Sequence, residues 1–219
     1  MSLGFILLIL AGLLVLFGAG QRVLDRLRLT DRQALLFIAL IIGGGFLPEI
    51  RVTPLFSFNV GGALIPLMLC FFLWAKADTA AERARSVAAT LVTAVAVYLI
   101  GRNFPEEPEA MPFDINYLYG LAAGAIACAF GRSRRGAFFA GTLGVMLANV
   151  ITAAEVWSMG VNQTLVLGGA GGFDVIVISG LSAVLLAELI GEVAERVKRG
   201  GKAPAQAFHG GDFVKKEGR

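Results

Sequence analysis

Residues 168–180 read Gly-Gly-Ala-Gly-Gly-Phe-Asp-Val-Ile-Val-Ile-Ser-Gly, a glycine-rich segment that carries one carboxylate into a long apolar run. Each glycine destabilises a helix by about 1 kcal/mol relative to alanine, so we expect a non-helical segment from Val166 to Gly172. Asp174 lies at the edge of the apolar run, where an ionisable group is costly and is therefore a candidate functional residue. Its alternative role is to cap the following helix by accepting hydrogen bonds from free N–H groups.

The composition indicates a membrane protein. Of the 219 residues, 57% are hydrophobic and 16% are charged, and the mean hydropathy is +0.75. Soluble domains carry roughly 25% charged residues. We therefore expect a polytopic transmembrane domain over residues 1–195, followed by a basic, flexible cytoplasmic tail over residues 196–219.

Apolar runs separated by charged turns predict an all-α membrane protein of about seven transmembrane helices. A segment over residues 52–60 alternates loosely and contains Pro54, which predicts a short extended or re-entrant piece at the outer face. Several runs are shorter than the ~20 residues that a span needs, so some of them could merge. The runs cover residues 3–19, 34–47, 61–75, 87–100, 117–130, 136–156 and 175–190.

The basic residues predict the orientation. With seven spans, all of the 19 lysines and arginines except Arg51 and Arg102 fall on one side. Because positive residues concentrate in the cytoplasm, we expect a multi-pass protein of the cell (plasma or inner) membrane with its N-terminus outside and its C-terminus in the cytoplasm. The first run has no preceding Lys or Arg, which indicates a retained helix and not a cleaved signal.

Several site classes are disfavoured by the residue inventory. Cys70 and Cys128 lie inside apolar runs, with neither a disulfide framework nor metal-ligand spacing. The single histidine, His209, lies in the tail, which excludes a histidine-based site in the membrane. The basic residues form no separate face, so nucleic acid is not an expected partner. We expect no metal and no cofactor.

Three patterns concern helix packing. Gly120-x-x-x-Gly124 predicts a close-packed helix face, and the stripe of Ser86, Thr90 and Thr93 is more typical of helix–helix packing than of a ligand path. Glu188 lies fourteen residues after Asp174, about 21 Å along a helix. We expect Glu188 near the opposite interface, where it extends to water or forms an ion pair.

Polar residues gather at the predicted outer face. Two short segments echo each other, Val60-Gly61-Gly62-Ala63 and Leu167-Gly168-Gly169-Ala170, and paired glycine-broken segments point to a site between them. The candidate catalytic residues are Asp114 and Asp174. The candidate substrate-binding residues are Asn59, Gly61, Gly62, Asn116, Glu155, Gly171 and Gly172.

Parts of the chain resemble two known families. The chain, and especially residues 59–66 and 168–179, resembles a family of prokaryotic multi-spanning membrane proteins known only as a domain of unknown function. Locally, Gly171-Gly172-Phe173-Asp174 is similar to the Gly-x-Gly-Asp motif of intramembrane aspartyl proteases, and Phe113-Asp114 is similar to the motif of their first aspartate. Phe173 departs from that pattern, because the proteases have glycine directly before the aspartate.

The protease resemblance implies a hydrolase with two aspartates. One protonated and one ionised carboxyl would flank a water, because two close carboxyls in a low dielectric share a proton. The substrate would be a transmembrane peptide. The alternatives are a proton- or cation-coupled carrier of a small solute, with Asp174 or Glu155 beside freed carbonyls, and a non-catalytic membrane scaffold. The lipid bilayer is a partner in every case, and no oligomeric state is predicted.

Overall fold

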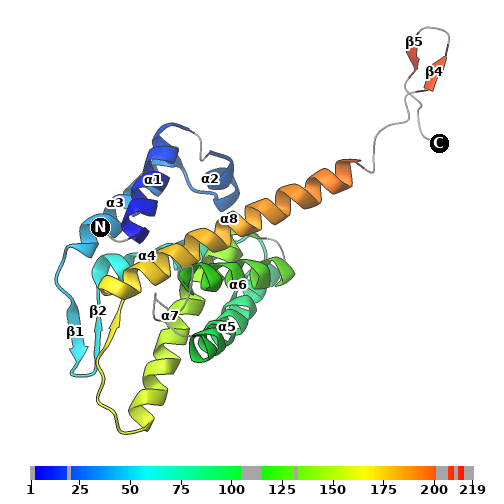
Figure 1. The fold of residues 1–219 in the computed structure, drawn as a ribbon. Coiled ribbons are helices and arrows are strands. Elements are labelled where there is room, and N and C mark those ends of the chain that lie inside the picture. The colour runs from blue at the N-terminus through cyan, green and yellow to red at the C-terminus, as the bar shows by residue number, and fades with distance from the viewer. Residues whose placement is uncertain are drawn as a thin grey trace.

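The computed structural model describes residues 3–18, 21–104, 115–130, 133–200, 207–209 and 212–214, which are mostly helical (Figure 1). The helices are α1 (Leu3–Leu16), α2 (Gln21–Leu27), α3 (Asp31–Gly45), α4 (Ile65–Ala75), α5 (Ala80–Asn103), α6 (Ile115–Phe130), α7 (Arg134–Ser158) and α8 (Ala170–Gly200). A π-helical turn, η1 (Val60–Leu64), precedes α4. The strands are β1 (Ile50–Thr53), β2 (Phe56–Phe58), β3 (Leu165–Leu167), β4 (Ala207–His209) and β5 (Asp212–Val214).

The long elements run alternately between two ends of the molecule. At one end, which we call the basic end, Arg134 at the start of α7 meets Glu188 late in α8. At the other, which we call the glycine end, Arg102 at the end of α5 meets Glu155 near the end of α7. The glycine end also holds β1, β2, β3 and η1, because β3 follows α7 and leads into α8.

Among the described residues, three helices are long and apolar enough to cross a membrane: Ala80–Asn103, Arg134–Ser158 and Val175–Ala194. The other apolar helices, Gly4–Leu16, Val60–Ala75 and Tyr117–Phe130, have 10–17 residues. The structure therefore supports a helical membrane protein with three candidate spans, and the count of about seven spans stays a prediction.

Side-chain caps define where helices begin at the basic end. Thr79 accepts a hydrogen bond from Glu82 N at 3.1 Å, and Ser133 accepts one from Gly136 N at 3.2 Å. A cap of this kind satisfies one of the free N–H groups of the first turn and typically stabilises a helix by about 1 kcal/mol. The N-termini of α5 and α7 consequently open at the same end of the bundle.

Helices α5 to α8 pack on small side chains. A Cβ at Gly120 would collide with Ser182, and one at Gly124 would lie 2.8 Å from Leu186. The predicted close-packed face of Gly120 and Gly124 is thus confirmed, and it lies against α8. Thr93 packs against Gly144 of α7 in the same way, which confirms a packing role for the polar stripe on α5.

The extended segments predicted at the glycine end are present. Strand β2 pairs antiparallel with β1 and parallel with β3, so Phe58 lies opposite Leu167. The prediction that residues 166–172 are non-helical throughout is wrong for residues 170–172, because α8 begins at Ala170. The first N–H groups of a helix need no intrahelical partner, which makes glycine in the first turn less disruptive than glycine in the interior.

Candidate functional site

The two glycine-broken segments meet at the glycine end, in a contact that we call the glycine crossing (Gly44, Gly61, Gly62 and Gly168). A Cβ at Gly62 would collide with the carbonyl oxygen of Gly168, and one at Gly61 would collide with the backbone of Ile41 and Gly45. Gly168 also has φ +69°, a conformation that side chains disfavour. The two glycine-broken segments that echo each other in the sequence therefore touch at Gly62 and Gly168, and main-chain atoms fill this contact.

Asn59 holds the glycine crossing together. Its side chain accepts a hydrogen bond from Gly62 N at 2.9 Å and donates one to Leu47 O at 3.2 Å, and its backbone N–H donates to Leu167 O at 2.9 Å. The residue is 7% exposed. These contacts commit the Asn59 amide to neighbouring backbone, which gives this candidate binding residue a structural role.

Glu155 belongs to a separate cluster at the glycine end. It accepts a hydrogen bond from Tyr98 Oη at 2.6 Å and forms an ion pair with Arg102 Nη1 at 2.9 Å. Arg102 also donates a hydrogen bond to Tyr98 Oη at 2.8 Å. This triad links the ends of α5 and α7. The Glu155 carboxylate is therefore paired with a cation and occupied by its neighbours on α5.

The remaining predicted site residues are only partly visible. Asp114 lies outside the described residues. Asn116 belongs to α6, and Gly171, Gly172 and Asp174 belong to the first turns of α8. For these four residues the structure describes the backbone alone. The pairing of Asp114 with Asp174 stays a prediction.

One carboxylate at the glycine end escaped the sequence reasoning. Glu49 Oε2 accepts a hydrogen bond from the buried Ser57 at 3.4 Å, and Oε1 lies 3.3 Å from where a Cβ on Gly169 would be. Glu49 therefore lies beside Gly169, the residue that precedes α8. Its signal in the sequence was weak, because Pro48-Glu49 resembles an ordinary turn after three glycines.

A cavity of about 460 Å³, which we call the basic pocket, lies at the opposite end of the bundle. Its rim combines four arginines with three carboxylates, together with the capping residues Thr79 and Ser133. Its lining residues are Asp25, Arg28, Asp78, Thr79, Glu82, Arg85, Ser86, Ala89, Ala127, Phe130, Ser133, Arg134, Arg135 and Gly136.

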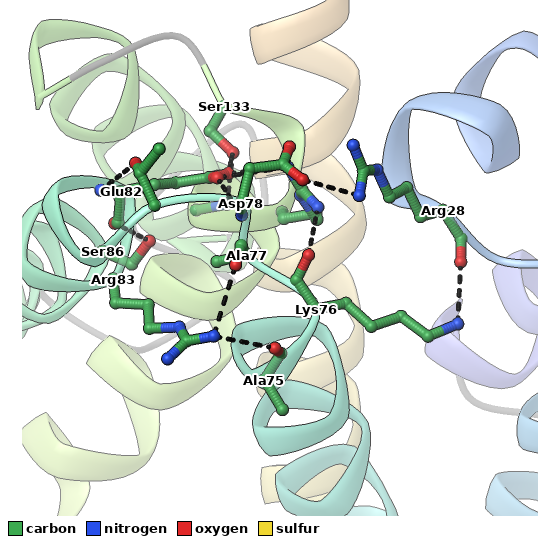
Figure 2. A network of polar contacts seen from close by, with 12 residues as sticks. Arg28, Ala75, Lys76, Ala77, Asp78, Glu82, Arg83, Ser86 and Ser133 are labelled. Carbon is green, nitrogen blue, oxygen red and sulfur yellow. Dashed lines mark hydrogen bonds and ion pairs between the residues drawn. The ribbon is translucent and has the colours of Figure 1, made fainter.

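Asp78 ties separate parts of the chain together beside this pocket (Figure 2). It forms ion pairs with Arg28 at 2.6 Å and with Arg135 at 3.0 Å. The hydrogen bond from Arg135, assisted by Arg28, lowers the pKa of the Asp78 carboxyl below its ordinary value. Lys76 donates to the Arg28 carbonyl at 3.1 Å, so the turn before α3 is fastened to the turn before α5.

Arg135 is the centre of the same network. It pairs with Glu82 at 3.1 Å and donates to the carbonyl of Lys76 at 2.6 Å, in addition to its contact with Asp78. Glu82 also accepts a hydrogen bond from Ser133 Oγ at 2.7 Å. Because the Arg135 side chain is only 11% exposed, these contacts join the first turns of α5 and α7 in a partly desolvated site.

Arg134 faces α8. Its Nε lies 2.9 Å from Glu188, and the two side chains are 11% and 15% exposed. This contact confirms the ion pair that was one of the two roles expected of Glu188. Gly191 permits it, because a Cβ there would collide with the guanidinium of Arg134.

Several guanidinium nitrogens at the basic end lack an acceptor within the described ranges. Arg134 Nη2 and Arg135 Nε are buried and have no acceptor among the described residues. Arg85 lines the pocket and forms no ion pair or hydrogen bond with another part of the chain that the structure describes. Arg85 is therefore the pocket-lining guanidinium whose donors are accessible to a ligand.

The sequence contains the residues that line this pocket, but no pattern in it indicates that they lie together. The arginines at 132, 134 and 135 served there only to predict orientation, since positive charge in a turn is typical of the cytoplasmic side. A second signal is that α5 and α7 begin in a similar way: each follows a residue with a capping hydroxyl, Thr79 in Asp78-Thr79 before α5 and Ser133 before α7.

The geometry describes a helical membrane protein that is closed by backbone contacts at one end and carries a basic pocket at the other. The chain belongs to the family described as protein of unknown function (DUF1614), whose model matches residues 23–186. The match includes both the glycine crossing and the basic pocket, and it confirms the resemblance to a domain of unknown function. No curated protein and no solved structure matches the chain.

The comparisons do not bear on the resemblance to aspartyl proteases. A metal site was not expected from the sequence, and the described residues contain no group of three or more His, Cys, Asp or Glu side chains that could hold a metal ion.

Proposed function

We propose that this protein is an integral membrane protein that binds a phosphate-bearing anion in the basic pocket. The observation that carries the proposal is a cavity of about 460 Å³ lined by four arginines, of which Arg85 is exposed and makes no ion pair with the described residues. An anion in the pocket supplies acceptors to the guanidinium groups of Arg85 and Arg135.

The helix ends favour phosphate. The N-termini of α5 and α7 open at the pocket, and each carries a partial positive charge and free N–H groups. Phosphate binds readily at helix N-termini, and arginine presents a planar fork of donors that suits its oxygens. The arrangement suits binding and not catalysis, because the Ser133 hydroxyl is bonded to Glu82 and the Glu82 carboxylate is paired with Arg135.

The acidic residues hold the binding groups in position. Asp78 and Glu82 hold Arg135 by ion pairs, so its guanidinium is fixed before a ligand arrives. Arg85 is free of such pairs with described residues and therefore contributes charge that can neutralise an incoming anion. A preorganised binding group loses less entropy when the ligand binds.

The distribution of charge supports the orientation we propose, with the basic end at the cytoplasmic face of the cell membrane, the N-terminus outside and the C-terminus inside. Cysteines introduced singly into intact cells would test it. Cysteines within residues 132–135 should resist an impermeant reagent, whereas cysteines within residues 106–109 should react with it. The reverse pattern would contradict the orientation and leave phosphate binding to be judged by its own assay.

The binding test uses the purified full chain in detergent, titrated with inorganic phosphate. Phosphate should raise the midpoint of thermal unfolding in a saturable manner, because a ligand of the native state stabilises it. Arg85→Gln should remove this rise. Arg32→Gln is the matched control, since Arg32 is exposed at the same end and does not line the pocket. Equal shifts in all three proteins, or none in any, would contradict the proposal.

A second candidate function is the intramembrane aspartyl hydrolase that uses Asp114 and Asp174. Two features favour it: strand β3, which pairs with β2, leads extended backbone to the start of α8, and Glu49 adds a further acid at that end. The test is cleavage of a generic transmembrane peptide by purified protein. Asp114→Asn and Asp174→Asn should each abolish cleavage, and variants as active as the parent would refute this candidate.

A further inference from the structure

Two of the charged side chains that line the basic pocket are unpaired. The other arginines and carboxylates of the lining form ion pairs: Arg28 and Arg135 with Asp78, Arg135 with Glu82, and Arg134 with Glu188. Asp25 and Arg85 form no ion pair or side-chain hydrogen bond with any residue that the structure describes. Both residues are exposed. The pocket therefore presents one negative and one positive charge to a ligand.

Asp25 belongs to α2, a short helix that packs on the bundle. Leu24 and Leu27 of this helix are buried, and they belong to the same hydrophobic cluster as Leu73 of α4 and Val184 of α8. Burial of leucine side chains holds the helix against its neighbours. Asp25 itself is exposed and lines the cavity, so the packing of its own helix fixes its place at the pocket.

The turn after α2 fastens this wall of the pocket to α5. Arg28 has φ +56°, a left-handed conformation that side chains disfavour and that glycine usually takes at the end of a helix. Its N–H donates to Asp25 O at 3.1 Å, its carbonyl accepts from Lys76 Nζ at 3.1 Å, and its guanidinium pairs with Asp78 at 2.6 Å. Such a conformation persists where the surrounding contacts hold it. Because Asp78 comes directly before the cap of α5, Asp25 and Arg85 belong to two walls that are joined to each other.

A phosphate group alone does not use both of the unpaired charges. A phosphate monoester carries about −1.5 to −2 charges at pH 7, so Arg85 attracts it and the carboxylate of Asp25 repels it. A cationic group on the same molecule offsets this repulsion and adds a charge-assisted hydrogen bond. The cavity of about 460 Å³ has room for such a molecule, since small-molecule sites commonly measure roughly 300–1,000 Å³. The charges and the size of the pocket therefore favour a phosphate compound that also carries an amine.

We infer that the ligand of the basic pocket is a small phosphate monoester with a primary amine, whose phosphate binds Arg85 and whose ammonium group binds Asp25. This inference rests on the proposed function, because it names the chemical class of the phosphate-bearing ligand. One unpaired charge of each sign on two joined walls of the same cavity carries it. Such a ligand leaves the ion pairs of Arg135 intact, so binding requires no exchange of partners within the network.

The experiment is isothermal titration calorimetry of the purified full chain in detergent at neutral pH. Three probes are compared: phosphoethanolamine, propyl phosphate and ethanolamine. Propyl phosphate carries a methyl group in place of the ammonium group, so it matches phosphoethanolamine in length and differs from it in charge. Phosphoethanolamine should bind at least about tenfold more tightly than propyl phosphate, because it alone forms a charge-assisted hydrogen bond with Asp25. Ethanolamine, which lacks phosphate, should bind more weakly than either phosphate compound.

Variants of the two unpaired residues assign each half of the ligand to its partner. In Asp25→Asn, phosphoethanolamine and propyl phosphate should bind within about twofold of each other, because the amide carries no negative charge. Asp31→Asn is the matched control and should retain the preference, since Asp31 is exposed and does not line the pocket. Arg85→Gln should weaken the binding of both phosphate compounds at least about tenfold.

The two proposals fail in different ways. If propyl phosphate binds the parent as tightly as phosphoethanolamine, or if Asp25→Asn keeps the preference, the inference of an amine is wrong and phosphate binding stands. If ethanolamine binds as tightly as phosphoethanolamine, the phosphate group is not recognised and both proposals are wrong. Both are also wrong if neither phosphate compound binds in an Arg85-dependent manner.

Discussion

The two ends of this bundle are held together by opposite means. At the glycine crossing, uncharged backbones touch directly, and a Cβ at Gly61 or Gly62 would collide with main-chain atoms. At the basic pocket, the elements are joined through long charged side chains around a cavity. Backbone contacts leave no room to adjust, whereas a network of arginines and carboxylates can exchange partners. The crossing is therefore suited to fixing the fold and the pocket to binding.

The largest effect should come from adding one methyl group at the crossing. Gly61→Ala should destabilise the protein by about 3 kcal/mol, because the neighbouring atoms belong to the backbone and cannot turn aside. Gly43→Ala is the matched control: nothing lies within 4 Å of its Cβ position, and alanine favours a helix. Thermal unfolding in detergent would measure both, and equal midpoints would contradict the close contact.

Arg135→Gln should have the next largest effect. It removes the ion pairs to Asp78 and Glu82 and leaves the partly buried Glu82 with less compensation, which should cost roughly 2 kcal/mol. Arg85→Gln should change stability by less than about 0.5 kcal/mol, because Arg85 is exposed and unpaired among the described residues. Urea unfolding of both variants would test this difference. Equal losses would indicate that the network contributes little to the fold.

Asn59→Ala should cost about 1 kcal/mol, the usual value of an N-terminal cap. The reason is that Gly62 N and Leu47 O each lose their hydrogen-bond partner. Asn103→Ala serves as control, since Asn103 makes one exposed hydrogen bond to Leu99 O and should be nearly neutral. A smaller loss at Asn59 than at Asn103 would contradict its role in the crossing.

The smallest effect should be a dependence of stability on pH at the basic end. The folded structure lowers the pKa of Asp78 through Arg135 and Arg28. The resulting stabilisation is complete above the ordinary pKa of about 3.9 and is lost as pH falls through the lowered pKa. Unfolding midpoints between pH 6 and pH 2 should therefore fall less in Asp78→Asn than in the parent. Asp31→Asn should behave as the parent does, and identical curves for all three would contradict the prediction.

The sequence anticipated the glycine end better than the basic end. Glycine pairs in residues 60–63 and 167–170 indicated two broken segments that approach each other, because this signal is local and arises from glycine's lack of a side chain. The partners of Asn59 could not be predicted in the same way. The hydrogen bonds that Asn59 donates to Leu47 O and Leu167 O depend on which backbone lies close, and that follows from the packing of α3, η1 and β3.

By itself the sequence indicated a helical membrane protein with a close-packed face at Gly120 and Gly124, and it placed Glu188 near the far end with either water or an ion pair as its partner. Each of these follows from hydrophobicity, spacing or rise per residue, which the local chain fixes. Only the tertiary structure brought Arg28, Asp78 and Arg135 together, because they lie on three separate segments. An ionic pocket exists only where helix ends from distant parts of the chain meet, and no periodicity in the sequence records that meeting.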